Sequence, residues 1–386
     1  MLQIDHIYEF LYQELFKDFE VWSLPNGVPK SSNVKFFDIH VFTRQPNADK
    51  KIFFYDQEPF IQQLADPYMS LFNDARDPRL TLLVTSEHST DLPTNVKFIY
   101  YFFHGFAALD WYRGYYSLNY NKQIAKLYKH DFITFNRIIN NDRSYRIYFV
   151  SILKQLELLD HGQVSFNVTN NIFDDWQDET ADPNSKLSEK AKQHAEQYLV
   201  DIDKLVIDQH TVHGSASADI PRTVDSYMHP GLPSPSNVDA FWHVVTETVF
   251  YYNKLHLTEK IFKPIVSKQP FMLLAAPGNL AFLKSYGFKT FDSVIDESYD
   301  TIQDNDRRTE AVVEQLHWYC DLTLGEKTDV IRQLEPIIDY NFHHFYGEFR
   351  HIITRELLDN TKTLFKEIGY DDSHIHYSNI HHVLTH

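Results

Sequence analysis

Short apolar segments alternate with helical segments through the first half of this chain, and this alternation constrains the fold most. The apolar segments are rich in Phe, Val, Ile and Tyr, which favour β-strands. They are Val34–Phe42, Lys51–Tyr55, Leu80–Thr85, Val96–Phe102 and Phe132–Phe135. Helical periodicity marks Phe60–Phe72 and Arg143–Leu159, and the second of these ends at His161 and Gly162. This alternation predicts an α/β fold with parallel sheets covered by helices.

The length of 386 residues predicts two domains, because single hydrophobic cores stop growing at roughly 250–300 residues. Residues 186–199 have a helical pattern, and residues 214–237 are dense in Ser, Pro and Gly, as is typical of a loop. Apolar strands resume at Phe241–Val245. The expected parts are a first domain (1–185), a connecting helix and loop (186–237), a second domain (238–345) and a carboxy-terminal helix and tail (346–386).

Charge and motif content exclude several kinds of site. Lys and Arg number 36 against 53 Asp and Glu, a formal net charge of −17, so a uniformly basic nucleic-acid-binding face is not expected. Neither G-x-G-x-x-G nor G-x-x-x-x-G-K-[ST] occurs, so any phosphate must be bound by helix ends and cations. The single cysteine, Cys320, excludes an intramolecular disulfide and a Cys-rich zinc site.

The amino terminus and the hydropathy of the chain bear on its location. The start MLQIDHIYEF has neither a basic nor an apolar signal region, and no run approaches ~18 apolar residues. Together with the lone cysteine, these features predict a cytoplasmic protein with no membrane partner.

The segment Thr246–Asp300 places polar groups around apolar strands more densely than any other part of the chain. Glu247 follows an apolar run, and Thr258 is placed to cap a helix that begins at the next residue. Such a helix start directs backbone N–H groups and partial positive charge at an anion. Lys260 and Lys263 add charge that suits a diphosphate. A carboxylate nearby accepts hydrogen bonds from sugar hydroxyls.

Four short motifs, EKIFKPI, PF, GFKTF and IDESYD, follow one another in this segment. In Thr-Glu-Lys and the apolar strand after it, the segment resembles the α1,3-fucosyltransferase family and, more loosely, exostosin-like domains. It is more similar to a set of viral, mostly bacteriophage, glycosyltransferases in which the four motifs recur in this order. The resemblance implies a GT-B fold, with two facing Rossmann-like domains and a cleft between them. The acceptor half departs from fucosyltransferases, so neither the sugar nor the acceptor carries over.

The resemblance assigns residues 238–345 to a nucleotide-sugar donor domain and residues 1–185 to an acceptor-side domain. It implies a UDP- or GDP-sugar as co-substrate and no other cofactor. The expected donor-binding residues are Glu247, His256, Thr258, Glu259, Lys260, Lys263, Asp296, Glu297 and Tyr299. Two of these also allow a purely structural interpretation, Lys263 as a solvated helix charge and Glu259 as part of a helix N-terminus. The loop that contains Asp296 and Glu297 is either a ligand contact or a solvated turn.

Four side chains in the first half are candidates for the base that accepts the proton of the acceptor hydroxyl. Asp56 and Glu58 follow an apolar strand that ends at Pro59. His104 is expected at the end of the next strand, and Asp110 follows it. An inverting transfer needs such a base, whereas a retaining transfer does not. The histidine also has a structural interpretation.

Basic and aromatic side chains in this half are candidate contacts to a phosphate or to the acceptor. The arginines form one cluster: Arg137, Arg143 and Arg146. They suit the phosphates of a donor or of a nucleic-acid backbone. Alternatively, Arg146 pairs with Asp142 on its own helix. Trp111 and Tyr112 are candidates to stack on an accessible or flipped base.

No metal ion is expected at the site. Asp201–Asp203 and Asp304–Asp306 fit the Asp-x-Asp pattern, but acidic chains produce this pattern by chance, and both are interpreted as solvated turns. Lys260, Lys263 and a helix N-terminus are expected to stabilise the leaving group instead.

The sequence thus predicts a glycosyltransferase that moves a hexose or pentose from a nucleotide diphosphate to an acceptor hydroxyl. If a phage encodes the chain, the compartment is the host cytoplasm. The expected acceptor is a hydroxymethylated cytosine in phage DNA or, alternatively, a glycan. Two further interpretations are a non-catalytic nucleotide-sugar-binding protein and a nucleotide-diphosphate hydrolase or epimerase. The second is disfavoured because no Rossmann glycine fingerprint is present.

Overall fold

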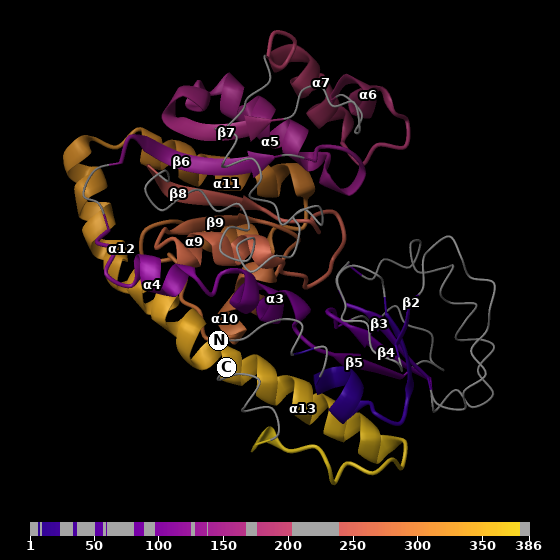
Figure 1. Ribbon diagram of the computed structural model, residues 1–386. Helices are drawn as coiled ribbons and strands as arrows, with labels where there is room; N and C mark the ends of the chain where they lie inside the picture. The colour runs from indigo at the N-terminus through magenta and orange to yellow at the C-terminus, as the bar shows by residue number, and fades with distance from the viewer. Residues whose placement is uncertain are drawn as a thin grey trace. The chain divides into compact units, whose positions relative to one another are not determined.

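The computed structural model describes residues 7, 10–23, 34–36, 51–56, 59, 81–88, 97–124, 128–136, 138–166, 176–202 and 239–378. Within these ranges the protein is a mixed α/β structure with two parallel sheets, which is compatible with Rossmann-like domains (Figure 1). The chain divides into two compact units. Unit 1 comprises residues 1–113 and 347–386, and unit 2 comprises residues 114–346.

Unit 1 contains a five-stranded sheet in the order β2-β1-β3-β4-β5, in which all neighbours are parallel. Its strands are β1 (Glu20–Ser23), β2 (Val34–Phe36), β3 (Lys51–Tyr55), β4 (Thr81–Thr85) and β5 (Lys97–Tyr100). The strands predicted from residues 51 and 80 onward are confirmed. The order reverses between β1 and β3, which is where open α/β sheets bind ligands beyond the carboxyl ends of their strands.

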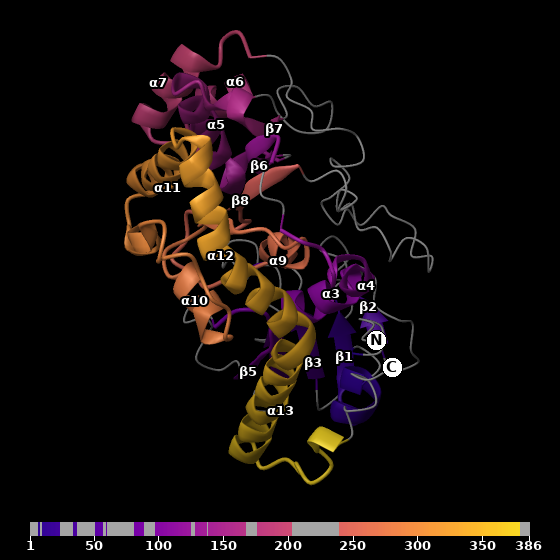
Figure 2. The same cartoon turned by 90° about the vertical axis from the view of Figure 1, so that its left-hand side faces the viewer.

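Helices cover this sheet. They are a π-helical turn (Phe10–Leu15), α3 (Phe103–Trp111) and α13 (Arg350–Glu367). Helix α13 runs beside β5 and contacts α3 (Figure 2). The ring of Phe16 contacts the rings of Phe54 in β3 and Phe365 in α13, at centroid distances of 5.9 and 6.0 Å. These aromatic contacts account for part of the chain's high Phe content as ordinary core.

The prediction that His104 ends a strand is wrong. Strand β5 already ends at Tyr100, and His104 is the second residue of α3, where it is buried. Gly105, in the first turn of α3, packs closely against Phe349. A Cβ at Gly105 would lie 3.0 Å from Cζ of Phe349, so glycine lets the two elements approach closely.

Unit 2 contains a four-stranded parallel sheet in the order β7-β6-β8-β9. Its strands are β6 (His130–Asn136), β7 (Gly162–Phe166), β8 (Ala240–Thr246) and β9 (Phe271–Leu274). All residues of β8 and β9 are buried, as expected for a parallel sheet covered on both faces. The chain passes from β6 to β7 on one side and then to β8 on the other, so the order reverses between β6 and β8.

The α-helices of unit 2 are α4 (Tyr115–Asn119), α5 (Tyr145–Gln155), α6 (Trp176–Ala181), α7 (Glu189–Tyr198), α9 (Phe262–Val266), α10 (Asn279–Ser285), α11 (Asn305–Cys320) and α12 (Leu324–His344). Short turns of 3-10 helix occupy Asn141–Arg143, Leu158–His161, Glu259–Ile261 and Glu297–Thr301. Helix α11 packs against α5 and β9, and α5 packs against α7 (Figures 1 and 2). The predicted helix at 186–199 corresponds to α7.

The two units do not match the domains expected from the sequence. The expected first domain ends at residue 185, whereas unit 2 already begins at residue 114. Strands β6 and β7 belong to the expected first domain, yet they form one sheet with β8 and β9. Residues 347–386 belong to unit 1, together with the amino-terminal sheet. Strands β7 and β8, which flank residues 214–237 in the sequence, belong to the one sheet of unit 2, so the composition change there does not separate two sheets.

Several expectations fall outside the described residues. They concern the predicted helix at 60–72, the loop at 214–237 and most of the expected strand at 34–42. None of the helices in the described ranges has both the length and the apolar character needed to cross a membrane.

Candidate functional site at the carboxyl edge of the second sheet

The candidate site lies where β6 and β8 end side by side in unit 2. We call it the carboxyl edge and define it as Phe135 and Asn136 of β6, Thr246–Thr248 at the end of β8, and the turn Thr258–Lys263. The hydroxyl of Thr246 donates to the backbone oxygen of Phe135 over 2.9 Å and joins the two strand ends. The edge therefore coincides with the reversal of strand order, the usual ligand position in sheets of this kind.

The carboxylate of Glu247 organises this edge from within. Glu247 directly follows β8, as predicted, and is fully buried. Its Oε1 accepts from the backbone N–H of Thr258 at 3.1 Å, and its Oε2 accepts from the hydroxyl of Thr258 at 2.6 Å and from the N–H of Thr248 at 3.2 Å. These bonds occupy the carboxylate with protein donors. Glu247 thus fixes the turn.

Thr258 and Lys260 complete this polar network. Thr258 is the N-cap of the 3-10 turn, as predicted, and accepts from the N–H of Lys260. The ammonium of Lys260 donates to the hydroxyls of Thr248 and Thr258 at 3.0 and 2.9 Å and lies 3.9 Å from Oε2 of Glu247. Glu259, also buried, lies 3.6 Å from the same ammonium. A quarter of the Lys260 side chain remains exposed, at 26%.

The helix after this turn is shorter than expected. Three 3-10 residues lead into the five-residue α9, and the chain leaves the helix at Ser267 and Lys268, the latter with φ at +53°. All five residues of α9 are buried. A helix this short has only a small macrodipole. Side-chain cations, and not the helix end, are therefore the main source of positive charge at the carboxyl edge.

Lys263 is the unusual member of the carboxyl edge. Its side chain is only 4% exposed, and among the described residues its ammonium has no hydrogen-bond partner. The ammonium lies 5.3 Å from the ring centroid of Phe135, at the end of β6. Burial lowers the pKa of Lys263 to about 8, although the Glu259 carboxylate opposes the shift. Burial, and then the Lys263 charge, lowers the pKa of the nearby His243 to about 3, so that imidazole is neutral.

Two further polar atoms at or beside this edge lack partners within the described part of the chain. They are Oδ1 of Asn136, a fully buried residue that ends β6, and Nε of Arg146. Buried polar groups without partners are rare in folded proteins and usually point to a missing ligand or water. Sequence reasoning missed Asn136, which carried only the signal of being the last residue of an apolar strand.

Arg146 has a structural role. Its guanidinium donates to the backbone oxygens of Ile138 at 2.9 Å and Thr246 at 2.7 Å, so it ties α5 to the end of β8. The alternative pairing of Arg146 with Asp142 is wrong, because Asp142 contacts Lys186 and the hydroxyl of Tyr252. Arg143 lies half-buried in the turn before α5, and Arg137 is outside the described residues.

Arg308 is a second structural arginine, which sequence reasoning did not identify. It is 1% exposed and donates to the backbone oxygens of Phe250, Ala275 and Ile302 at 2.7–2.9 Å. Burial lowers its pKa to about 10. The residue thus connects the end of β9 to the segment after β8.

The acidic loop 296–299 is engaged within the protein. Asp296 caps the turn by accepting from the N–H of Ser298. Glu297 accepts from the hydroxyl of Thr290 and the N–H of Phe291, both at 2.6 Å, and pairs with Lys284 at 3.0 Å. Tyr299 is 1% exposed and belongs to the core. The backbone N–H of His256, also a buried residue, donates to Oδ1 of Asn279.

The candidate bases of the first half lie in unit 1. Asp56 directly follows β3, as predicted, and its Oδ2 accepts from the hydroxyl of Tyr101 at 2.5 Å. Asp110 is fully buried in α3 and paired with Arg113. Glu58 lies outside the described residues.

The two aromatic candidates for base stacking differ in exposure. Trp111 is half-buried at the end of α3, whereas Tyr112 is 1% exposed and belongs to the core. Of the Asp-x-Asp pairs, Asp304 accepts from the N–H of Arg307 as the N-cap of α11, and Asp306 accepts from the hydroxyl of Ser188. The second pair therefore has structural partners, and Asp203 of the first is outside the described residues.

The geometry thus retains the carboxyl edge, with Lys260 and Lys263 beside the Glu247 network, as the place where a bound anion would fit. Comparisons with protein-family models, with curated proteins and with solved structures give no match to this chain.

Proposed function

We propose that the protein is a nucleotide-sugar-dependent glycosyltransferase whose donor diphosphate binds at the carboxyl edge of unit 2. The observation that carries the proposal is the Lys263 side chain, which is only 4% exposed and whose ammonium lies 5.3 Å from the ring centroid of Phe135, with no hydrogen bond to the described residues. Removing an ammonium from water is costly, and a bound anion offsets that cost.

A diphosphate matches the groups at this edge. Lys263 and the partly exposed Lys260 supply two cations within one helical turn, and both lie next to the ends of β6 and β8. Phosphate oxygens accept charge-assisted hydrogen bonds, which are the stronger kind. When the sugar transfers, the diphosphate gains negative charge as the leaving group, and fixed cations stabilise that charge.

The two lysines have separate parts in this proposal. Lys260 already donates to Thr248 and Thr258, so it contributes charge from a position that the Glu247 network fixes. Lys263 contributes an unused donor. The ligand contact of Lys263 should therefore be the larger of the two, in contrast to the sequence-based emphasis on Lys260.

Binding of a panel of UDP- and GDP-sugars, measured by isothermal titration calorimetry, tests the donor site. We expect Lys263→Met to weaken the affinity by about 10–100-fold, the loss of one hydrogen bond to a charged group. Lys289→Met is the matched control, because this exposed lysine contacts the ring of Tyr340 and should leave the affinity unchanged. Equal affinity in wild type and a folded Lys263→Met protein would refute the donor site.

Turnover is a separate measurement, namely release of the nucleotide diphosphate with and without acceptors. We propose DNA that contains 5-hydroxymethylcytosine as the first acceptor to test and glycans as the second. Nucleotide-sugar binding without release in either case favours the alternative of a non-catalytic nucleotide-sugar-binding protein.

A further inference from the structure

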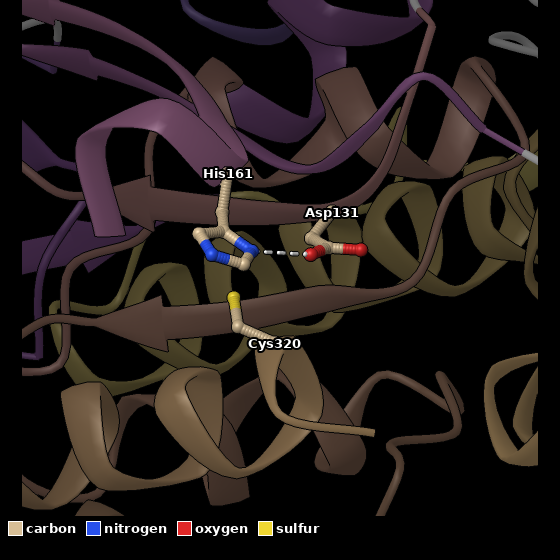
Figure 3. Close-up of side chains that lie close together, drawn as sticks. All are labelled: Asp131, His161 and Cys320. Atoms are coloured by element: carbon tan, nitrogen blue, oxygen red, sulfur yellow. Dashed lines mark hydrogen bonds and ion pairs between the residues drawn. The ribbon is translucent and has the colours of Figure 1, made fainter. Parts of the chain in front are cut away.

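Three side chains of different chemistry converge at the opposite edge of the same sheet (Figure 3). They are Asp131 near the start of β6, His161 directly before β7, and Cys320 at the end of α11. One ligand atom from each lies within 4.8 Å of the other two. With Lys327, which contacts this cluster, we call them the amino edge.

We propose that Asp131, His161 and Cys320 bind a divalent transition metal of the zinc type. The proposal does not depend on the function proposed for the carboxyl edge. Thiolate, imidazole and carboxylate are the three ligand classes that zinc uses, whereas magnesium and calcium prefer oxygen alone. Three protein ligands leave a fourth position of a tetrahedral ion for water.

The distance between the imidazole and carboxylate ligand atoms is close to that of a zinc site, and the thiol lies within 4.8 Å of both. Nδ1 of His161 and Oδ2 of Asp131 are 3.0 Å apart. In a tetrahedral zinc site, neighbouring ligand atoms lie about 3.3–3.6 Å apart, given the usual zinc–ligand bond lengths. The thiol of Cys320 is buried, whereas the side chain of His161 is 44% exposed. A metal ion can therefore enter past His161.

A protein cation already marks this position. The ammonium of Lys327 lies 2.9 Å from both carboxylate oxygens of Asp131 and 3.1 Å from the backbone oxygen of Cys320. The edge therefore stabilises positive charge. An incoming metal ion takes the place of this ammonium, whose side chain is partly exposed and can turn to solvent. The thiol releases its proton on binding, and the thiolate and Asp131 together balance the two metal charges.

The same three residues do not form a nucleophilic triad. In such a triad an imidazole activates the thiol. Here the Asp131 carboxylate lies near the thiol, and burial, followed by the charge of that carboxylate, raises the pKa of Cys320 to about 12. The thiol is thus protonated and unreactive without a metal.

Cobalt(II) titration of the full-length protein tests the site. Cys320 is the only cysteine, so a near-ultraviolet thiolate-to-cobalt charge-transfer band reports this site alone, despite the 21 histidines of the chain. We expect one such band, saturating at one cobalt per chain and displaced by zinc. Its absence in wild type at millimolar cobalt would overturn the proposal without any variant.

Variants then identify the ligands. Cys320→Ser should abolish the band, and His161→Gln should weaken cobalt binding by at least about tenfold. Lys327→Met should retain the band and tighten binding, because it removes the competing cation. His317→Gln is the matched control, since this exposed histidine of the same helix pairs with Asp321. A band of equal affinity in wild type, His161→Gln and Asp131→Asn means that the thiolate binds cobalt without the proposed ligand set, and this also refutes the site.

Discussion

The two edges of the unit 2 sheet differ in the charge that the protein leaves uncompensated. At the carboxyl edge, the one carboxylate at the strand end, Glu247, is bonded to backbone and hydroxyl donors, while the ammonium of Lys263 has no hydrogen-bond partner in the described chain. At the amino edge, Asp131 has an imidazole, a thiol and an ammonium around it. The first arrangement suits an anion and the second a cation.

The difference follows from the topology of the sheet. In a parallel α/β sheet, strands end and helices begin at the carboxyl edge, while helices end at the amino edge. Cys320 is the last residue of the 16-residue α11, and its backbone oxygen accepts from Lys327. Helix C-termini carry partial negative charge, which favours cations. The fold thus predisposes its two edges to ligands of opposite charge.

Of the changes that test the contrast between the two edges, loss of the Glu247 carboxylate should have the largest effect on stability. Glu247→Ala leaves Lys260 and three donors without their buried acceptor, so we expect a loss of about 3–5 kcal/mol in the free energy of unfolding. Urea denaturation measures it. Glu314→Ala, at an exposed pair with Arg307, is the control and should cost less than about 1 kcal/mol. A loss below 1 kcal/mol at Glu247 would mean that the network does not organise the edge.

Lys263→Met should change the free energy of unfolding in the opposite direction. Because Met removes a charge that burial disfavours, we expect the ligand-free protein to gain about 1–3 kcal/mol at pH 7. The folded pKa of about 8 lies below the ordinary value of 10.5, so the unfolded chain binds more protons between these values and wild-type stability rises with pH across this window. The gain should therefore be complete below pH 8 and disappear near pH 10.5. Destabilisation by Met at pH 7 would show that Lys263 is structural.

The pH dependence of nucleotide-sugar affinity should also report the titration of Lys263. A bound diphosphate favours the ammonium form, and the ligand-free pKa of Lys263 is about 8. Nucleotide-sugar affinity should thus be level below pH 8 and fall by up to about tenfold at higher pH. Calorimetry from pH 7 to 9.5 measures this fall. The Lys263→Met protein corrects for titration of the nucleotide base and should show a flatter profile; parallel profiles for the two proteins contradict the assignment.

Local rules were sufficient to predict part of this site from the sequence. Thr258 as a cap and Glu247 after a strand both follow from residues within a few positions of each other, and both are confirmed. The pairing of β6 with β8 is not local: more than 100 residues separate them, and the Ser-, Pro- and Gly-rich composition of residues 214–237 suggested a domain boundary. The backbone oxygens that Arg308 binds come from Phe250, Ala275 and Ile302, up to 58 residues away in the sequence, so no local sequence pattern could identify them.

Tertiary packing also overrides local propensity in unit 1. The run Tyr100–Phe103 has strand-forming residues, yet it contains the end of β5 and the start of α3, and Gly105 of that helix packs against Phe349, more than 240 residues further along the chain. The amino-edge cluster is similar. Asp131, His161 and Cys320 are spread over 190 residues and have no metal-binding spacing, so only the fold brings them together.

The smallest effect concerns the ammonium of Lys327. Its ion pair with Asp131 is partly exposed, with side chains 18% and 17% accessible, so Lys327→Met should cost only about 0.5–1 kcal/mol without added metal. With saturating zinc this cost should disappear, because the metal-bound state lacks the ion pair in both proteins, so zinc should stabilise the variant by more than it stabilises the wild type. Thermal unfolding without zinc measures the cost of the substitution, and unfolding with zinc measures how the metal changes it. Lys190→Met removes a more exposed pair with Glu310 and should show a small cost that zinc does not change. If zinc shifts the melting temperature of Lys327→Met no more than that of Lys190→Met, the ammonium does not occupy the position of a metal, and the contrast between the two edges reduces to the uncompensated lysine at one of them.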